Sequence, residues 1–317
     1  MKKSLIIVAV AFIAVGIALF TGALVASGFD FSALGGAKYE TNEYEVADDF
    51  YNISILTKET DVGFKKSDDG KTKVVLVERE KENHSVSVED GTLKITVEDE
   101  RQWYERISLF SKSLSLTVYL PSDEYSDLLV EVATGDVSVP DTFSFASAKI
   151  TTSTGDVSLS ASVTGNLEIS TSTGNISVAE LTAGKLDLSV STGDVSVRKV
   201  SCGGVSVKVS TGKAKLTDLN CSSLVSRGTT GDITLENVVA AENFDVERST
   251  GDVKFINCDA SEIKVVTRTG DVTGTLRSEK IFHAKTTTGR SSVPNTVAGG
   301  VCDIETTTGD ISIAITE

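Results

Sequence analysis

The chain has 317 residues, a formal net charge of −15 and only 6% aromatic residues. An acidic, repulsive surface argues against binding to nucleic acid and against adsorption to an anionic membrane face. The length of the chain does not indicate its number of domains, because the chain contains a short internal repeat and an array of repeats can have any length.

The first predicted element is an apolar N-terminal helix. Residues 4–29 contain no charged residue, and Lys2 and Lys3 precede them. A helix from Leu5 to Val25 is about 30 Å long, enough to cross a bilayer. A secretory signal peptide is the competing interpretation, but its apolar region is usually about 7–15 residues long, and Leu24 makes a poor cleavage site. We therefore predict a single-pass transmembrane anchor over residues 1–26, with the N-terminus in the cytoplasm and the rest of the chain outside the cell.

The next two segments are a tether and a cap. Residues 27–38 mix small and polar residues and are predicted to be a short tether. Residues 39–127 contain strand-like runs of irregular spacing, separated by turns such as Asp69-Gly70 and Asp90-Gly91. We expect an irregular β cap and distorted first coils here, because the terminal units of a repeat array are atypical.

Residues 128–317 carry a phrase that recurs ten times and is clearest at residues 189–197, Ser-Val-Ser-Thr-Gly-Asp-Val-Ser-Val. Apolar residues lie seven and five positions before each Thr-Gly glycine and two and four after it, so a strand is predicted on each side. Such a unit must stack on its neighbours to bury its apolar face. The pattern predicts an all-β fold, a parallel β-solenoid (β-helix) of about ten coils of 19–20 residues. The predicted corner glycines are Gly135, Gly155, Gly174, Gly193, Gly212, Gly231, Gly251, Gly270, Gly289 and Gly309.

The residue after each corner glycine is usually a carboxylate, as in Asp136, Asp156 and Asp194. Carboxylates stacked about 4.8 Å apart offer the oxygen ligands that Ca²⁺ prefers. Asp and Asn also favour turns, because their side chains bond to nearby backbone N–H groups. We favour the turn interpretation, since Lys213 and Arg290 interrupt the column. No metal or other cofactor is predicted.

A threonine precedes every corner glycine, often as Thr-x-Thr, as in Thr152 and Thr154. Strict alternation places it on the inward side of the strand. We therefore predict a ladder of hydroxyl groups that closes the corner, rather than an outward ice-binding face.

Two cysteines occupy equivalent positions in consecutive coils. Cys202 and Cys221 are predicted to lie about 5 Å apart at their Cα atoms, within reach of a disulfide. Their parallel Cβ vectors disfavour that bond, and free cysteines in the core are the alternative.

The chain offers little for catalysis. Its two histidines, His84 and His283, are far apart in sequence, and neither a Ser-His-Asp arrangement nor a glycine-rich phosphate loop is recognisable. A carbohydrate-active β-helix enzyme needs clustered carboxylates on one outward face beside aromatic sugar platforms. After Tyr125 the chain has no Tyr or Trp. We expect a protein that is not an enzyme and keep a carbohydrate-active enzyme as the alternative.

One segment of the cap has the composition of a contact site. Its residues are Arg101, Trp103, Tyr104 and Arg106, and it holds the only Trp in the chain. Trp, Tyr and Arg are favoured in binding hot spots. The same segment is also suited to plug the open end of the first coil.

The last strand of the array raises the possibility of self-association. Residues 311–315 alternate Ile311, Ile313 and Ile315, and no later element is predicted to cover their edge. Because an unpaired strand edge can template pairing with another chain, we expect end-to-end association.

Several segments resemble a known family. The lead-in Tyr39-Glu40-Thr41-Asn42-Glu43-Tyr44, the strand end Tyr119-Leu120-Pro121 and the segment Leu128-Leu129-Val130-Glu131-Val132-Ala133-Thr134-Gly135-Asp136-Val137 are similar to the domain-of-unknown-function 4097 family. The resemblance covers residues 39–317. It implies a β-solenoid outside a bacterial membrane, in proteins labelled as adhesins, some of whose relatives are associated with envelope stress. It implies no catalytic residues.

Together these features predict a non-enzymatic, membrane-anchored bacterial surface protein. Its solenoid is expected to act as an adhesin, or as an envelope sensor or scaffold, through contacts with a protein or glycan partner. A purely structural, self-associating spacer is a further alternative.

Overall fold

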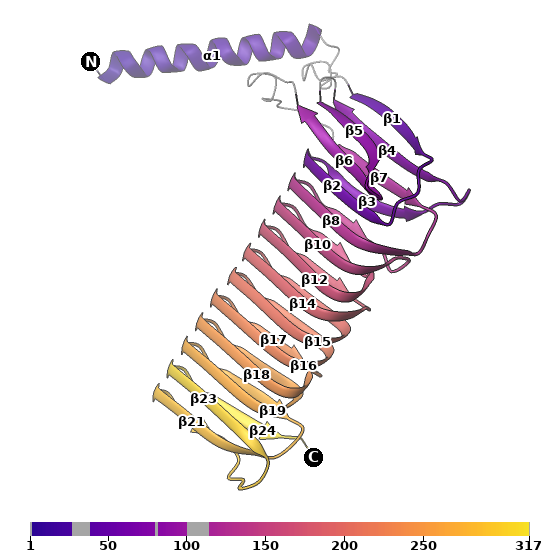
Figure 1. Ribbon diagram of the computed structural model, residues 1–317. Coiled ribbons are helices and arrows are strands. Elements are labelled where there is room, and N and C mark those ends of the chain that lie inside the picture. The colour runs from indigo at the N-terminus through magenta and orange to yellow at the C-terminus, as the bar shows by residue number, and fades with distance from the viewer. Residues whose placement is uncertain (1, 27–38, 80–81, 100–113, 317) are drawn as a thin grey trace.

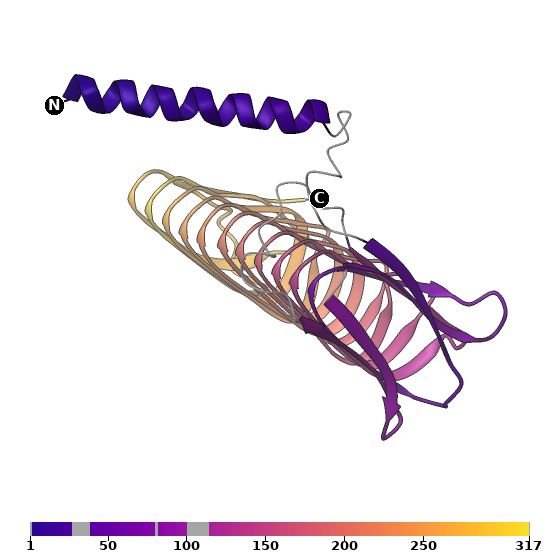
Figure 2. The ribbon, with the colours of Figure 1, turned by 90° about the horizontal axis from the view of Figure 1, so that it is seen from above.

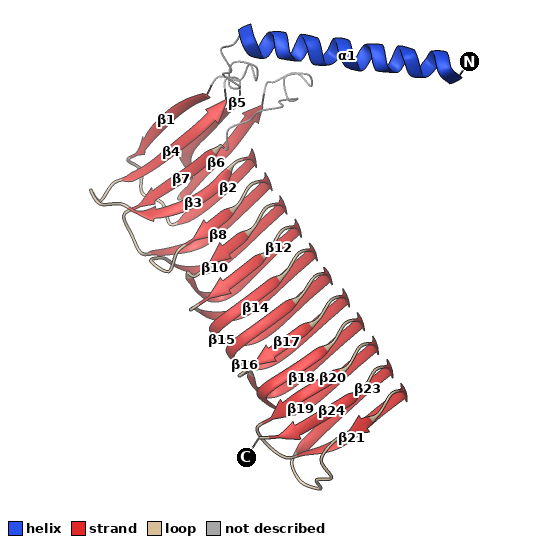
Figure 3. Cartoon of the chain, turned by 180° about the vertical axis from the view of Figure 1, so that it is seen from behind, coloured by secondary structure: helices blue, strands red, loops and turns tan. Residues whose placement is uncertain are grey.

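The protein was analysed as a computed structural model that describes residues 2–26, 39–79, 82–99 and 114–316 (Figure 1). One helix is followed by strands that stack into an elongated solenoid (Figure 3). The strands of the N-terminal part are β1 (Tyr39–Val46), β2 (Asn52–Glu59), β3 (Asp61–Lys66), β4 (Thr72–Arg79), β5 (Glu82–Glu89), β6 (Thr92–Asp99), β7 (Ser115–Leu120), β8 (Glu124–Thr134) and β9 (Val137–Val139). Those of the middle are β10 (Ser144–Thr154), β11 (Val157–Leu159), β12 (Ser162–Thr173), β13 (Ile176–Ala179), β14 (Thr182–Thr192), β15 (Val195–Thr211), β16 (Ala214–Thr230) and β17 (Ile233–Glu236). Those of the C-terminal part are β18 (Val239–Thr250), β19 (Val253–Thr269), β20 (Val272–Leu276), β21 (Lys280–Thr288), β22 (Ser291–Ser292), β23 (Gly300–Thr308) and β24 (Ile311–Ile315).

Helix α1 (Lys2–Ala26) occupies the segment for which we predicted a membrane anchor. Within the part of the chain that the structure describes, no helix combines the length and the apolar character that crossing a membrane requires. The prediction of a helix is confirmed, and the prediction of a transmembrane anchor is not supported.

The solenoid is built as the repeat predicts. In each regular coil a long strand leads to the Thr-Gly corner, and a second strand continues on the other face, as β14 leads to β15. Equivalent strands of neighbouring coils pair in parallel, for example Leu188 with Val207. The ten corner glycines delimit about nine turns. Seen from above, successive coils nest one behind another around a common core (Figure 2).

The predicted core positions are confirmed. In the coil of Gly193, Leu186, Leu188, Val195 and Val197 are at most 2% exposed. The equivalent residues of the other regular coils join the same continuous cluster, except Ser226, Gly274 and Ser291. Because each coil contributes only a few apolar side chains, the core exists only as a stack.

The corners need glycine for two reasons. Gly193 has φ 140°, a conformation that side chains rarely adopt. A Cβ atom built on it would lie 2.0 Å from the carbonyl oxygen of Gly174 in the preceding coil. The coils therefore touch backbone to backbone at this corner.

The order of the last two coils differs from the prediction. Strand β23 pairs with β19 on one side and β21 on the other, and β24 lies between β20 and β22. The coil of Gly309 is thus inserted before that of Gly289, and the terminal edge belongs to β21 and β22 rather than to residues 311–315 (Figure 1). The inserted coil turns Cys302, Ile304, Ile311 and Ile313 inward, all at most 5% exposed. Its apolar face gains more from two covering neighbours than the partly polar face of β21 does.

The N-terminal end is closed by a different arrangement. Strands β2 and β3 form a coil in register with β8 and β9, with Thr60 in place of the corner glycine. Strands β6 and β7 add a further layer in parallel with β2 and β3. The chain then reverses direction, because β5 pairs antiparallel with β6, β4 with β7 and β1 with β4.

The corner contact can be tested with a pair of glycine substitutions. We expect Gly193→Ala to lower the free energy of unfolding by about 2–4 kcal/mol, because it adds both φ strain and a backbone clash. Gly204→Ala is the control, since its Cβ would have no atom nearer than 3.7 Å and the change should be within about 1 kcal/mol of neutral. Urea unfolding of both variants checks this. Equal destabilisation would contradict the proposed corner contact.

Candidate functional site

The predicted contact segment lies outside the described residues. Arg101, Trp103, Tyr104 and Arg106 fall in residues 100–113, between the end of β6 at Asp99 and Leu114. The choice between a plug and a contact site therefore stays a prediction.

The carboxylate column at the corners forms a hydrogen-bonded ladder between coils. The backbone N–H of Asp156 donates to Asp136 Oδ1 at 2.8 Å, that of Asn175 to Asp156 Oδ1 at 2.7 Å, and that of Lys213 to Asp194 Oδ1 at 2.7 Å. The ladder begins at Asp61, which accepts from Asp136. Each side chain thus caps the N–H of the next coil. This is the turn role that we favoured, except that the bond runs between coils rather than within one.

The ladder predicts different effects for its acidic and basic members. Asp194→Ala should cost about 1–2 kcal/mol of unfolding free energy, because it leaves the N–H of Lys213 without its acceptor. Lys213→Ala removes only an exposed ion pair of 3.7 Å with Asp232 and should cost less than about 0.5 kcal/mol. Chemical denaturation of both variants provides the measurement. A larger loss for Lys213→Ala would overturn this role.

The prediction of a hydroxyl ladder at the threonine before each glycine is wrong, and inward threonines occur at a different position in only some of the coils. The threonine directly before each glycine is exposed, as Thr154 and Thr173 are. The residue two positions earlier points inward instead: Thr171 Oγ1 donates to Gly155 O at 3.3 Å, and Thr306 Oγ1 to Gly270 O at 3.1 Å. Strict alternation was the wrong rule here, because the chain bends before it reaches the glycine.

All four cysteines are free thiols. Burial raises the pKa of Cys202 to about 11 and that of Cys221 to about 12. Cys258 is fully buried and donates weakly to the carbonyl of Leu235. These thiols are core residues that stay protonated near neutral pH, so the alternative that we favoured agrees with the structure.

One buried polar network was not anticipated from the sequence. His84 Nδ1 lies 2.8 Å from Glu78 Oε2, and His84 Nε2 lies 3.0 Å from Thr57 Oγ1. Glu78 also accepts from the backbone N–H of His84 and from Asn42 Nδ2. The order carboxylate, imidazole, hydroxyl is that of a hydrolytic triad. However, all three side chains face the core and are at most 6% exposed, so the network joins β1, β2, β4 and β5 rather than presenting a nucleophile.

The sequence did contain a signal for this network. His84, Val86 and Val88 alternate along one strand and so lie on the same face, which the two valines place inward. The imidazole of His84 is therefore expected in the interior, where it needs a hydrogen-bond partner. The partner could not be identified, because the pairing of β2, β4 and β5 is set by the antiparallel cap.

We expect Glu78→Ala to lower the free energy of unfolding by about 3 kcal/mol. The substitution leaves Asn42 Nδ2 and two nitrogens of His84 without their hydrogen-bond acceptor. Lys94→Ala, which removes an exposed ion pair with Glu89 on the same hairpin, should cost less than about 1 kcal/mol. Hydrogen exchange should show the loss of protection in β4 and β5 first. Unchanged protection in Glu78→Ala would contradict a pinning role.

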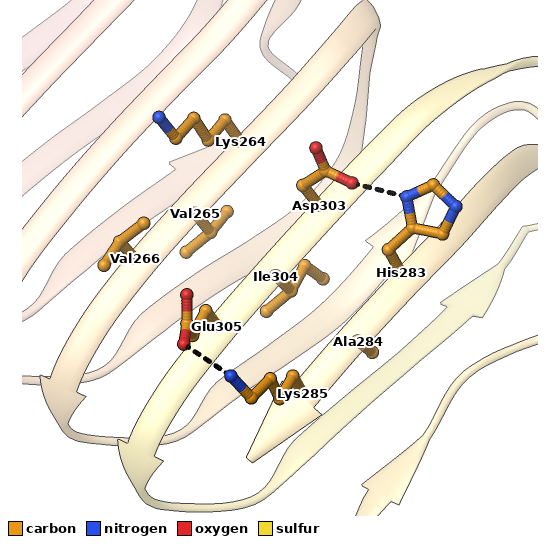
Figure 4. A pocket seen from close by; sticks show the side chains of 9 residues that line it. All are labelled: Lys264, Val265, Val266, His283, Ala284, Lys285, Asp303, Ile304 and Glu305. Carbon is orange, nitrogen blue, oxygen red and sulfur yellow. Dashed lines mark hydrogen bonds and ion pairs between the residues drawn. The ribbon is translucent and has the colours of Figure 1, made fainter. Parts of the chain in front are cut away.

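The outer face carries a depression at the C-terminal end of the solenoid. It has a volume of about 430 Å³ and is formed by three neighbouring strands, β19, β23 and β21. Two rows of outward residues line it (Figure 4): Lys264, Asp303 and His283 form one, and Val266, Glu305 and Lys285 the other. The exchange of the last two coils assembles this site, because it places β23 between the other two strands.

Opposite charges alternate across the depression. His283 Nδ1 lies 2.7 Å from Asp303 Oδ1, and Lys285 Nζ lies 3.3 Å from Glu305 Oε1 (Figure 4). These side chains are more than half exposed, so the contact between His283 and Asp303 and the ion pair between Lys285 and Glu305 are both solvated and open to exchange partners. Two carboxylates and three basic side chains in one concave patch can accept hydrogen bonds from, and donate them to, polar groups such as hydroxyls, amides or charged side chains.

The sequence analysis did not assign these residues. It noted His283 only as remote from His84, and after Tyr125 it noted only that Tyr and Trp are absent. The cluster depends on the order of the coils, and nothing in the local pattern of residues 280–305 specifies that order.

The comparisons with known proteins identify the family. The sequence profile of the Toastrack DUF4097 family matches residues 50–222 and 204–317. The chain belongs to this family, which confirms the resemblance drawn from the sequence. No curated protein matches the chain.

Several solved structures are similar to this chain at low sequence identity. A "putative adhesin" from Bacteroides fragilis is 18% identical, with a TM-score of 0.42 over 87% of this chain and 97% of the other. A "putative lipid binding protein" from Parabacteroides distasonis is 16% identical, with a TM-score of 0.48 over 88% and 98%. A "putative adhesin" from Parabacteroides merdae is 14% identical, with a TM-score of 0.45 over 88% and 98%.

Proposed function

We propose that this protein is a non-enzymatic binding module of the bacterial cell surface, which makes adhesive contacts through the depression formed by β19, β23 and β21. Membership of the Toastrack DUF4097 family and the names of the similar solved structures support an adhesin-like role. Sensing or scaffolding at the envelope would use the same kind of contact.

The observation that carries the proposal is the position and chemistry of the depression. It lies at the end of the solenoid opposite β1, the first strand after residues 27–38 (Figure 1). If the chain is held at the cell through its N-terminal side, this end reaches farthest outward. Its charged pairs are solvated and exchangeable, which suits reversible recognition of a polar glycan or protein surface.

We also propose that the protein acts outside the cytoplasm. The uncharged stretch of residues 4–29, preceded by Lys2 and Lys3, has the composition of an export segment. Protease accessibility on intact cells and the N-terminal sequence of the mature protein test this. Cleavage only after lysis would refute an outer location.

The carbohydrate-active enzyme remains the second candidate because of one observation. Asp303 and Glu305 project from the same face of β23, two residues apart, into the depression (Figure 4). Paired carboxylates are what glycoside hydrolysis uses. Both are already engaged by His283 or Lys285, and the residues lining the depression include no Tyr, Trp or Phe for sugar stacking. Binding without turnover is therefore the better fit.

A matched pair of double variants tests the binding role. We expect Asp303→Asn/Glu305→Gln to weaken retention on glycan panels and on isolated cell envelopes at least about tenfold, through loss of charge-assisted hydrogen bonds. Glu168→Gln/Asp187→Asn makes the same change in charge on the same outer face and should retain wild-type binding. Equal binding by all three proteins would refute the site. Release of new reducing ends by the wild type, lost in the first variant only, would favour the enzyme.

A further inference from the structure

Both ends of the solenoid present strand edges that could pair with another chain. Among the described strands, β21 pairs only with β23, and β5 pairs only with β6. They close the same face of the solenoid at its two ends and are similar in length, with nine and eight residues. An edge strand presents a row of backbone N–H and C=O groups that a further strand can extend.

The core is also incompletely covered at these two ends. At the C-terminal end Phe282, Ala284 and Val293 pack against the core but are only partly buried. At the N-terminal end Val86 and Val88 are in the same situation. The equivalent apolar positions of the coils between them are nearly inaccessible. Each end therefore has apolar surface that one more layer would bury.

The charges of the two ends are opposite. Residues 280–302 contain Lys280, Lys285 and Arg290 and no acidic residue, in a chain with a net charge of −15. Lys280 is buried against Asp259 and Lys285 pairs with Glu305, so Arg290 contributes the exposed charge of this end. Strand β1, which is the edge beside β5 at the other end, contains Glu40, Glu43 and Glu45 and no basic residue. Two of these glutamates face lysines of the β4 side at 3.5 and 3.7 Å, in exposed pairs that neutralise them only weakly.

We infer that the protein associates head to tail with further copies of itself, the edge of β21 of one copy pairing with the edge of β5 of the next. In copies stacked with the same orientation the two strands run antiparallel, because β5 is antiparallel to β6 and the regular coils are parallel. Phe282 and Ala284 then cover Val86 and Val88, and the basic end meets the acidic β1. This contact joins two different surfaces and does not close on itself, so it produces linear assemblies.

The depression used in the proposed function stays accessible in this arrangement. The charged residues that line it project from the outer face of the sheet, whereas stacking uses the strand edge and the inward side of β21, so Ala284 is the one lining residue that the two contacts share. The inference is therefore independent of what the depression binds.

Charge reversal at the two ends tests the inference on the full chain, kept in one non-ionic detergent so that helix α1 is treated equally in all samples. The tail variant is Arg290→Glu, which leaves the depression unchanged, and the head variant is Glu45→Lys. The control Lys254→Glu makes the same change in charge as the tail variant at an exposed position in the middle of the solenoid. Sedimentation velocity over a wide range of concentration measures association.

We expect the wild type and the control to form a concentration-dependent series of oligomers that weakens with added salt. The tail and head variants should each associate at least about tenfold more weakly on their own. An equimolar mixture of the two should recover association, because each altered end then meets a complementary partner. A wild type that stays monomeric, or a mixture that stays as weak as its components, would overturn the inference.

Discussion

The rest of the solenoid depends on one contact: each corner glycine lies against the backbone carbonyl of the corner glycine in a neighbouring coil. A Cβ atom would lie about 2 Å from that carbonyl at nearly every corner, so the backbones approach as closely as a chain allows. Irregularities in the pairing of the strands lie away from the glycine corner. Most of the register shifts fall near Phe145, Val163, Cys221 and Ala240, at the return to the long strand, and one falls near Phe255. The glycine corner thus fixes the register, and the opposite corner accommodates variation.

The ladder of acidic side chains gives a second reason for the order of the last coils. Asp310 lies between Asp271 and Arg290: its N–H donates to Asp271 Oδ1, and its Oδ1 accepts from the N–H of Arg290. If the coils stacked in chain order, Arg290 would precede Asp310 and offer it no acceptor. The exchange places Arg290, which like Lys213 cannot accept, at the last step, where no further coil needs its acceptor. It therefore preserves a hydrogen bond while also burying the more apolar coil.

The local sequence patterns predicted those features that neighbouring residues alone determine, namely the buried positions and the corners. Alternation with a period of two located the buried side chains, such as Leu186 and Val195, and the recurring Thr-Gly located the corners. The same alternation failed at Thr154, because it assumes a straight strand where the chain bends. The alternation could not place His283 beside Asp303 either. That pairing depends on which of the last two coils lies between two neighbours, and this is decided by comparing how much apolar surface each whole coil buries. The candidate site could not be predicted from the sequence for this reason.

The two proposals support each other in physical terms. A depression held together by solvated ion pairs binds any one partner weakly, because exposed charges gain little from pairing. Linear assembly would repeat that depression at regular intervals along one rigid body, so weak contacts with a surface would act together as avidity rather than singly. The solenoid suits this use, because parallel coils that share one continuous core leave little freedom between neighbouring sites. Each coil is stable only when it stacks on its neighbours, and in such an assembly whole chains would stack on one another in the same way.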